Sequence, residues 1–339
     1  MSSVHRGLDI RIFRKECVSL AAAGYDTHLV INATENDAKE AGIQGVTLHR
    51  LPESTGSGRL ARMSKHAWRC YAMAKCLDAD LYHLHDPELI PYGLLLARTG
   101  KKVIFDSHED LAGEIYSKDW IPGAARHVLS RVAQAVEGYA AARISAVVTA
   151  TPFIGGLFEQ SARRVAVINN YPLIGELMSC ASVKEARRDS ACYVGGIDAI
   201  RGIREAVQAI GKTRTTLLLA GTFTSEALRS EVMQYAGWSK VKEYGYVNRE
   251  AVAGIMARSF CGLVTLHRVP NFLNSRPIKM FEYMSAGVPV IASDFPLWRE
   301  IVEENQCGIC VDQNDPEAIA SAISHFHDNP DEVVRMGNN

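Results

Sequence analysis

The sequence predicts an α/β protein made of two Rossmann-like domains, each built around a parallel sheet. Short β-branched runs alternate with longer stretches of helical periodicity, which is the pattern of strands joined by crossover helices. The runs fall into two sets, separated by a charged stretch without apolar periodicity at residues 172–190. The chain of 339 residues also exceeds what one hydrophobic core usually serves, so we predict two domains.

Each predicted strand is a short apolar run. The first set comprises residues 26–32, 79–85, 102–108, 145–151 and 165–170, and the second comprises 191–196, 216–221, 241–247, 261–266, 288–294 and 307–312. We therefore predict a first domain over residues 1–171, a linker over 172–190 and a second domain over 191–339. Open parallel sheets bind ligands beyond the carboxyl ends of their strands, so polar residues that follow these runs are the site candidates.

Composition and charge exclude several classes of protein. The formal net charge is −1, which gives no general basis for binding nucleic acid. No apolar run reaches the roughly 18 residues of a membrane span, and the charged N-terminal stretch does not fit a signal peptide, so we expect a cytoplasmic protein. The eight cysteines are scattered and are interpreted as reduced thiols. Cys307 and Cys310 have zinc-knuckle spacing but no second pair, and they fall in a predicted strand.

The stretch from Asn274 to Asp294 carries the strongest functional signal. Ser275 is a good N-cap and Pro277 suits a first helical turn, so a helix should begin here with its N–H groups available to an anion. Lys279 and Glu282 then project one turn apart, and a buried strand follows the helix. This order of loop, helix and strand indicates a nucleotide-sugar site.

The same segment resembles the glutamate-x7-glutamate region of the family-4 retaining glycosyltransferases, and the resemblance covers nearly the whole chain. It implies the GT-B fold, in which two Rossmann-like domains face each other across a cleft. It also implies that Glu282 holds the ribose hydroxyls of a nucleotide, and that Asn274 occupies the position of the first glutamate, near the transferred sugar. An amide can bond a hexose hydroxyl but cannot stabilise a developing cation by its charge.

The resemblance also assigns a diphosphate site to the second domain. Gly195 and Gly196 follow its first strand, and Arg201 stands at the head of a helix in place of the family's lysine. Gly196 stands where many members have a second cation, an arginine. The family pattern places the loop containing Gly7 opposite the diphosphate, and it places Tyr246 near the base, for which uracil is preferred.

The acceptor side is expected at strand ends of the first domain. His108 matches the family's active-site histidine, which contacts the donor sugar, and Glu109 follows it. His85 and Asp86 end another run and are expected near the acceptor. His83 and His85 share one face of their strand, but no third ligand is local and GT-B enzymes need no metal, so we predict no metal site. A loop-capping role for His108 remains the alternative.

One segment suggests a membrane surface. Basic residues at helical spacing interleave with Trp68 and Tyr71 over residues 59–75, which suits an anionic inner-membrane surface or a lipid diphosphate. An ordinary surface helix with its apolar side packed inward is an equally good interpretation. Both termini look short against the family, so the first sheet is expected to lack a strand and domain closure to be looser.

The resemblance, together with these patterns, implies a retaining hexosyltransferase that needs no cofactor or metal. The resemblance implies transfer of a hexose or N-acetylhexosamine, GalNAc or GlcNAc for preference, from a UDP-sugar with formation of an α linkage. The expected acceptor is a sugar on a lipid diphosphate such as undecaprenyl diphosphate, in assembly of O-antigen or another surface polysaccharide. The alternatives are a sugar-nucleotide epimerase or hydrolase of GT-B fold, and a partner subunit that only binds. Catalytic roles are assigned to His108, Arg201, Glu282 and Asn274, and donor-binding roles also to Gly7, Gly195, Gly196, Tyr246, Ser275 and Lys279.

Overall fold

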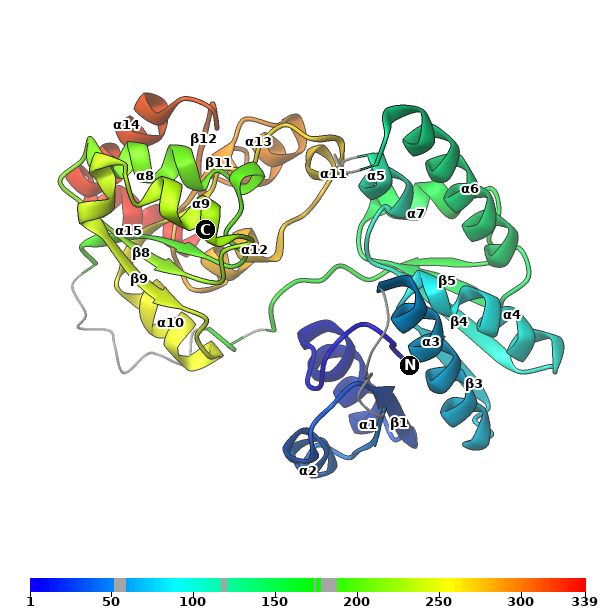
Figure 1. The fold of residues 1–339 in the computed structure, drawn as a ribbon. Helices are drawn as coiled ribbons and strands as arrows, with labels where there is room; N and C mark the ends of the chain where they lie inside the picture. Colours follow the sequence, from blue (N-terminus) through cyan, green and yellow to red (C-terminus); the bar gives the residue numbers. More distant parts are fainter. Residues whose placement is uncertain (52–58, 117–120, 174, 178–187) are drawn as a thin grey trace. The chain divides into compact units, whose positions relative to one another are not determined.

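The computed structural model describes residues 1–51, 59–116, 121–173, 175–177 and 188–339, with backbone only at residues 59–63 (Figure 1). It divides into two compact units, Met1–Asn170 and Tyr171–Asn339. Most of the linker predicted over residues 172–190 lies outside the described residues, so its extent stays a prediction.

The first unit contains two parallel sheets. In chain order its elements are η1 (Ile10–Cys17), α1 (Val18–Ala22), β1 (Thr27–Ile31), α2 (Glu35–Ile43), β2 (Val46–Arg50), α3 (Arg59–Cys76), β3 (Leu81–Leu84), η2 (Pro87–Leu89), α4 (Ile90–Arg98), β4 (Lys102–Ser107), α5 (Leu111–Tyr116), α6 (Gly123–Ala141), β5 (Ala146–Thr149), α7 (Pro152–Phe158) and β6 (Val165–Val167). β1 pairs with β2, and β3, β4, β5 and β6 form a four-stranded sheet in that order. All five predicted runs form strands, and β2 is an addition that the sequence reasoning missed.

The first residues of the chain lie between the two sheets. The Ser2 N–H donates to the carbonyl oxygen of Val30 on β1 at 2.9 Å, and the His85 N–H at the end of β3 donates to that of Met1 at 3.2 Å. The N-terminal segment therefore bridges the gap between β1 and β3, and it brings His5 close to the end of β3.

Alternation along β3 and β4 separates the core from a polar face. Tyr82 and Leu84 of β3 and Phe105 of β4 belong to the hydrophobic core of this unit. Successive side chains of a strand point to opposite faces, so His83 and Asp106 lie on the other side of the sheet. On that side they contact η1, which places a polar cluster at the carboxyl ends of two neighbouring strands.

The second unit has one six-stranded parallel sheet, in the order β12-β11-β10-β7-β8-β9. Its elements are β7 (Ser190–Val194), η4 (Ala199–Arg201), α8 (Ile203–Gly211), β8 (Thr216–Ala220), α9 (Glu226–Val232), η5 (Ala236–Lys240), β9 (Val241–Gly245), α10 (Arg249–Ala257), β10 (Ser259–Val264), α11 (Pro270–Leu273), α12 (Ile278–Ser285), β11 (Val290–Ser293), α13 (Pro296–Val302), β12 (Gly308–Val311), α14 (Pro316–Asp328) and α15 (Pro330–Asn338). All six predicted runs form strands. The strand order reverses between β7 and β10, which is the point where Rossmann folds bind ligands.

Helices cover both faces of this sheet (Figure 1). Ala191 and Tyr193 of β7 pack into a core with α8, α9, α14 and α15, whereas Cys192 and Val194 pack into a second core with α10, α12 and α13. Burial on both faces explains why these strands read as continuous apolar runs in the sequence.

The predicted basic helix is α3, and its described residues fit an ordinary packed helix. Ala67, Cys70 and Tyr71 are buried, while Lys65 is exposed and Trp68 is 54% exposed. The side chains of residues 59–63, including two of the basic residues, lie outside the described part. Contact of this helix with a membrane stays a prediction. Among the described helices, none combines the length and the apolar character needed to cross a bilayer.

The cysteines behave as predicted wherever the structure describes them. All seven described cysteines are free thiols, and Cys180 lies outside the described residues. Cys307 is buried immediately before β12, and its Sγ lies 3.5 Å from the carbonyl oxygens of Ile301 and Val302. Cys310 lies within β12, so this pair belongs to the fold of the strand.

Candidate active site

The loop after β7 is shaped by glycines. Gly195 has φ +117°, and a Cβ at Gly221 would lie 1.8 Å from the carbonyl oxygen of Gly195, so no larger side chain fits beside this turn. The Tyr193 hydroxyl lies 3.3 Å from the carbonyl oxygen of Gly196 and 3.1 Å from that of Arg201. These contacts hold the loop against the sheet and place Arg201 next to the glycine pair.

Helix α12 begins later than the sequence predicted. Its N-cap is Pro277 and no side chain caps it. The Ser275 hydroxyl instead donates to the carbonyl oxygen of Phe272 at 3.0 Å, and the Ser275 carbonyl accepts a bond from Trp298 Nε1 at 2.8 Å. The N-cap prediction for Ser275 is therefore wrong. With Ser275 as N-cap, position N2 would fall on Pro277, which has no N–H to offer.

The amino group of Lys279 is buried and has no hydrogen-bond partner in the described part of the chain. The residue is 8% exposed, and its Nζ lies 4.1 Å from the centroid of the Tyr193 ring. Burial, together with the nearby positive charge of Arg201, lowers the pKa of Lys279 to about 7. The sequence placed Lys279 in the site, but its unbonded amino group follows only from the packing of α12 against β7.

Glu282 is held by an arginine that the sequence reasoning missed. Arg249 Nη1 donates to Glu282 Oε1 at 2.6 Å, and Arg249 Nε donates to Glu176 Oε1 at 3.0 Å. Arg249 is the first residue of α10, where the helix dipole disfavours a cation. A basic residue at this position of a predicted helix was the one feature of the sequence that could have indicated an acidic partner. The pair fixes the orientation of a carboxylate that is itself buried.

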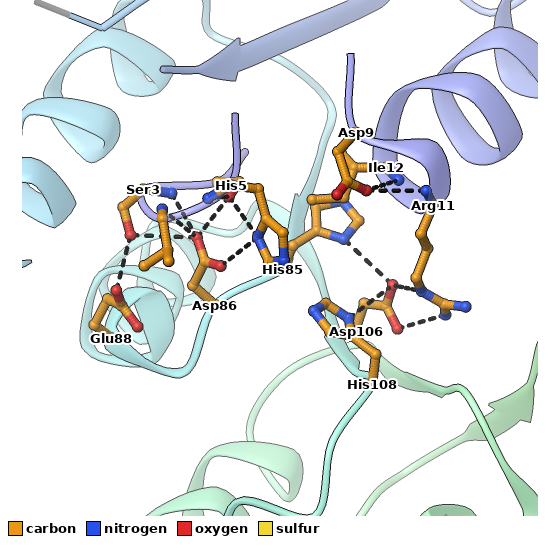
Figure 2. A network of polar contacts seen from close by, with 12 residues as sticks. Ser3, His5, Asp9, Arg11, Ile12, His85, Asp86, Glu88, Asp106 and His108 are labelled. Carbon is orange, nitrogen blue, oxygen red and sulfur yellow. Dashed lines mark hydrogen bonds and ion pairs between the residues drawn. The ribbon is translucent and has the colours of Figure 1, made fainter. Parts of the chain in front are cut away.

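Asp106 is the centre of the polar cluster in the first unit (Figure 2). It accepts bonds from Arg11 Nε at 2.9 Å and Arg11 Nη2 at 2.8 Å, which is the two-pronged geometry of a strong pair. His85 Nδ1 lies 3.3 Å from Asp106 Oδ2. His108 Nδ1 lies 3.6 Å from the same oxygen, too far for a direct hydrogen bond. Asp106 therefore joins η1 to the ends of β3 and β4.

Four side chains of this cluster could in principle ligate a metal. Donor atoms of Glu16, His83, His85 and Asp106 all lie within 4.8 Å of one another. No third ligand lies near the two histidines in the sequence, but η1 and β4 bring Glu16 and Asp106 to them in the fold. Arg11, however, contacts both carboxylates, at 2.8 Å from Asp106 and 3.2 Å from Glu16. Its guanidinium already supplies the positive charge that a metal would bring, and the absence of a metal requirement stays a prediction.

Burial keeps this cluster close to neutral. Burial and the neighbouring Asp106 raise the pKa of Glu16 well above the ordinary glutamate value. Although burial opposes it, contacts from His108, His85 and Arg11 hold the pKa of Asp106 below its ordinary value. Burial lowers the pKa of His85 to about 4, so this imidazole is neutral at pH 7. Asp106 and Arg11 thus carry opposite charges beside the neutral imidazole of His85.

A second carboxylate, Asp86, is enclosed by the N-terminal segment (Figure 2). His5 Nδ1 lies 2.9 Å from Asp86 Oδ1, and the Ser2 hydroxyl donates to Oδ2 at 2.8 Å. The Ser3 N–H also donates to Oδ2. This network orients His5, whose ring packs edge-on against that of His108 with centroids 5.4 Å apart. No local pattern around His5 signalled this role, because its partner lies 81 residues away.

Because Asp86 is enclosed in this way, we expect its carboxylate to stabilise the first unit at neutral pH and to lose this effect in acid. Although burial acts in the opposite direction, bonds from His5 and the Ser3 N–H lower the pKa of Asp86 to about 2 from 3.8. A depressed pKa stabilises the fold above the unfolded-state value, and the effect disappears as pH falls through the folded-state value. We expect Asp86→Asn to lower the free energy of unfolding by about 2 kcal/mol at pH 5 to 7, and by about half as much at pH 3.

Urea unfolding of both proteins at pH 5 and pH 3 tests this prediction, with the transition of the first unit identified by hydrogen-exchange mass spectrometry. Asp78→Asn is the control, because the Asp78 side chain is 86% exposed and its ion pair with Lys101 should contribute little. If the difference in the free energy of unfolding between Asp86→Asn and the natural protein is the same at pH 5 and pH 3, the assigned pKa of Asp86 is contradicted.

The remaining predicted residues fall into the two units separately. Gly7 has φ +35° and its N–H donates to the carbonyl oxygen of Asn32 at 2.7 Å, so it belongs to the N-terminal segment of the first unit. Glu109 follows β4 and is exposed. In the second unit, Asn274 caps the C-terminus of α11 and is exposed, and Tyr246 is 87% exposed after β9. Gly195, Gly196, Arg201, Lys279 and Glu282 come from the loop after β7 and from α12.

Comparison with protein families agrees with this division. Residues 11–170 match the model "Glycosyl transferase 4-like domain", and residues 181–339 match the model "Glycosyl transferases group 1". A curated relative, glycogen synthase of Mycobacterium tuberculosis (strain CDC 1551 / Oshkosh), is 22% identical over 262 residues, which is 74% of this chain and 61% of the relative. The alignment thus spans about three fifths of that relative's length.

Solved structures show the same fold at low sequence identity. The Anabaena protein Alr3699/HepE in complex with UDP-glucose superposes with a TM-score of 0.68 at 15% identity, covering 95% of this chain and 88% of that one. WaaG, a glycosyltransferase involved in lipopolysaccharide biosynthesis, gives a TM-score of 0.68 at 14% identity, covering 100% and 94%. The two Rossmann-like units are those of the GT-B fold. The chain therefore consists of a Glycosyl transferase 4-like domain in its first unit and a Glycosyl transferases group 1 domain in its second.

Proposed function

We propose that this protein is a metal-independent, retaining glycosyltransferase that uses a nucleotide-sugar, with UDP as the preferred nucleotide. The observation that carries the proposal is the polar edge of the second unit. There a glycine turn, two cations and an oriented carboxylate converge at the reversal point of the sheet, from the loop after β7 and from α12. Cations and backbone N–H groups suit a diphosphate, and a fixed carboxylate suits the two hydroxyls of a ribose.

In this proposal the second unit stabilises the leaving group. Arg201 and Lys279 face the diphosphate, and Glu282, oriented by Arg249, accepts from the ribose. Negative charge grows on the diphosphate as the glycosidic bond breaks, so fixed cations lower the barrier. The acceptor hydroxyl attacks the anomeric carbon on the leaving-group face, and its proton passes to the departing phosphate oxygen. This route retains the α configuration and needs no carboxylate nucleophile.

The first unit supplies the sugar and acceptor contacts in this proposal. His108 is only partly buried, so its ring can bond a sugar hydroxyl while the Asp106 cluster limits its movement. His85 and Asp86 are occupied by partners within the unit, so they act by positioning, whereas His5 and Glu109 remain accessible. Sequence reasoning predicted the acceptor at this edge, and the contacts of His5 with Asp86 and His108 support including His5 in the proposed acceptor side.

The finer substrate assignment rests on the structural likenesses and on the family resemblance. The likeness to a protein that was crystallised with UDP-glucose supports UDP as the nucleotide. The likeness to a glycosyltransferase of lipopolysaccharide biosynthesis supports a surface polysaccharide as the product. We propose a hexose or N-acetylhexosamine, GalNAc or GlcNAc for preference, transferred at the inner face of the membrane to a sugar on undecaprenyl diphosphate or a related lipid diphosphate.

Calorimetric titration with UDP, GDP and ADP tests the donor site, first with a chelator and then with magnesium. We expect one nucleotide to bind best and its affinity to be independent of the metal. Nucleotide-sugars are then incubated with and without acceptors, and nucleotide release is measured. Acceptor-dependent release supports a transferase. Nucleotide release without acceptor would favour the hydrolase alternative. Formation of an isomeric donor sugar would favour the epimerase alternative, and nucleotide binding without turnover would favour a partner subunit. An axial anomeric product, identified by NMR, supports retention.

Replacing His108 by alanine is expected to lower turnover by about 10²-fold or more, because a sugar held in a slightly wrong orientation reacts slowly. The dissociation constant of the nucleotide should stay within about threefold, since His108 belongs to the other unit and the donor's diphosphate contacts are unchanged. Steady-state kinetics and calorimetry measure the two effects separately. His127→Ala, an exposed histidine on α6, is the matched control and should leave both values unchanged.

A further inference from the structure

We infer that the amino group of Lys279 takes up a proton when a nucleoside diphosphate binds, so that donor binding is coupled to protonation of this one residue. The inference rests on the proposed function and deepens it, because it names how the diphosphate subsite acquires its second positive charge.

The position of Lys279 gives its amino group little choice of partner. The side chain rises from the first turn of α12, and its stem runs beside the loop, with Cδ 4.0 Å from where a Cβ on Gly195 would lie. Its Nζ ends over the Tyr193 ring, without a hydrogen bond to any described residue. A buried amino group is normally hydrogen-bonded, so one left unbonded here points to a missing partner, and an anion on the loop would be such a partner.

The loop itself supplies only one cation. Gly196 carries no side chain, and a Cβ built there would lie 3.5 Å from Arg201 Nη1. Arg201 therefore covers the glycine pair from one element, while Lys279 approaches the same pair from another. A diphosphate on this loop would lie between them, and Lys279 would supply the second cation that Gly196 does not.

The charges around Lys279 disfavour its protonated form in the empty site. Arg201 of η4 repels it, and the Glu282 carboxylate on its own helix is already paired with Arg249 of α10 at 2.6 Å. From β7 it faces the Cys192 thiol and the Tyr193 phenol, and burial raises the pKa of both, so neither carries negative charge at neutral pH. The Tyr193 ring face attracts the ammonium but offers only partial compensation.

A bound diphosphate favours the protonated form of Lys279. Burial and Arg201 lower the pKa of Lys279 to about 7, so a large share of the empty protein lacks this proton at pH 7 to 8. An anion within about 4 Å favours the charged amine and raises its pKa by about 1–3 units. At pH 8.3 binding then takes up about 0.3 proton per site for a rise of about 1 unit and about 0.9 proton for a rise of about 3 units. The affinity should fall up to about tenfold for each pH unit above the free-state pKa, until the bound-state pKa is reached.

Calorimetry in paired buffers measures the coupling directly. UDP, GDP and ADP are titrated at pH 8.3 in Tris and in HEPES, whose ionisation enthalpies differ, and the dependence of the apparent enthalpy on buffer gives the number of protons taken up. The terminal phosphate of the nucleotides titrates near pH 6, so it contributes little at this pH. We expect the natural protein to take up about 0.3 to 0.9 proton per nucleotide bound.

Two variants assign the proton to the residue. Lys279→Arg keeps a permanent positive charge and Lys279→Met keeps the stem without the amine, so each should bind the nucleotide with uptake close to zero and with an affinity that no longer falls between pH 7.5 and 9. The Lys279→Met variant should also have a nucleotide affinity at pH 7 that is lower by about tenfold or more. Lys212→Met, an exposed lysine on the same unit, should retain the uptake of the natural protein. Thermal unfolding confirms that each variant is folded.

The outcomes separate this inference from the proposed function. Nucleotide binding by the natural protein without proton uptake would overturn the inference and leave the donor site intact. Uptake that persists in both Lys279 variants would overturn the assignment to this residue. Failure of all three nucleotides to bind the natural protein would overturn the proposed function itself, and the inference with it.

Discussion

Asp106→Asn is expected to lower the free energy of unfolding of the first unit by about 3–5 kcal/mol, because it removes the ionised partner of a buried guanidinium and leaves it with Glu16, whose pKa is raised, at 3.2 Å. Arg11 donates two bonds to Asp106, at 2.9 and 2.8 Å, and the two side chains are 7% and 0% exposed. An asparagine keeps the shape of the side chain but removes its charge and presents an amide group to the guanidinium. His85 loses an acceptor in the same step.

Urea unfolding at pH 7 measures this effect, and hydrogen exchange of peptides from β3 and β4 locates it. Asp26→Asn is the control in the same unit, because the Asp26 side chain is 90% exposed and pairs only loosely with His28. Its effect should remain below about 1 kcal/mol. A loss below about 1 kcal/mol for Asp106→Asn would mean that the pair contributes no more than a surface ion pair and that the cluster does not organise this face.

The same substitution bears on function through His108. If Asp106 limits the movement of His108 by charge, Asp106→Asn should lower turnover while the nucleotide affinity of the second unit remains unchanged. A purely structural role would reduce the amount of folded protein without changing the turnover of the folded fraction. Active-site titration with a tight-binding nucleotide separates these cases.

Glu282→Ala is expected to raise the dissociation constant of the nucleotide by about 10–100-fold, because a hydrogen bond to a charged group contributes about 1.5–3 kcal/mol. Glu282 lies on α12 within reach of the ribose in the proposed complex, and Arg249 holds its Oε1 at 2.6 Å. Removal of the carboxylate also frees Arg249, which retains Glu176 as a partner at 3.0 Å. Turnover at saturating donor should change much less than affinity.

Calorimetry with the nucleotide and kinetics at saturating donor measure the two quantities. Glu243→Ala is the matched control, because it also removes the carboxylate of a Glu–Arg pair, with Arg229 at 2.9 Å, on β9 of the same unit. It should leave nucleotide affinity unchanged. The double variant Glu282→Ala with Arg249→Met shows whether the unpaired arginine contributes to the loss. Unchanged affinity in Glu282→Ala would remove this residue from the donor site.

The sequence by itself determined the number of domains and nearly all of the strands. Runs such as residues 216–221 are apolar throughout because both faces of a doubly wound sheet are buried, so local composition was enough to find them. The sequence did not predict β2, because His49 and Arg50 interrupt the apolar run of this half-exposed strand. The glycine turn and the pair Lys279 and Glu282 were also visible, since their spacing places them around a helix start.

Only the tertiary structure decided what these residues contact. Arg11 meets Asp106 across 95 residues and Arg249 meets Glu282 across 33, and no local pattern encodes such pairings. The sequence identified Ser275 as a helix cap from its residue type alone, whereas the missing N–H of Pro277 moved the start of the helix. The charge state of Lys279 depends on burial against Tyr193 and on Arg201, which come from other elements. Local propensity thus fixes where elements form, and long-range packing and electrostatics fix the chemistry at their ends.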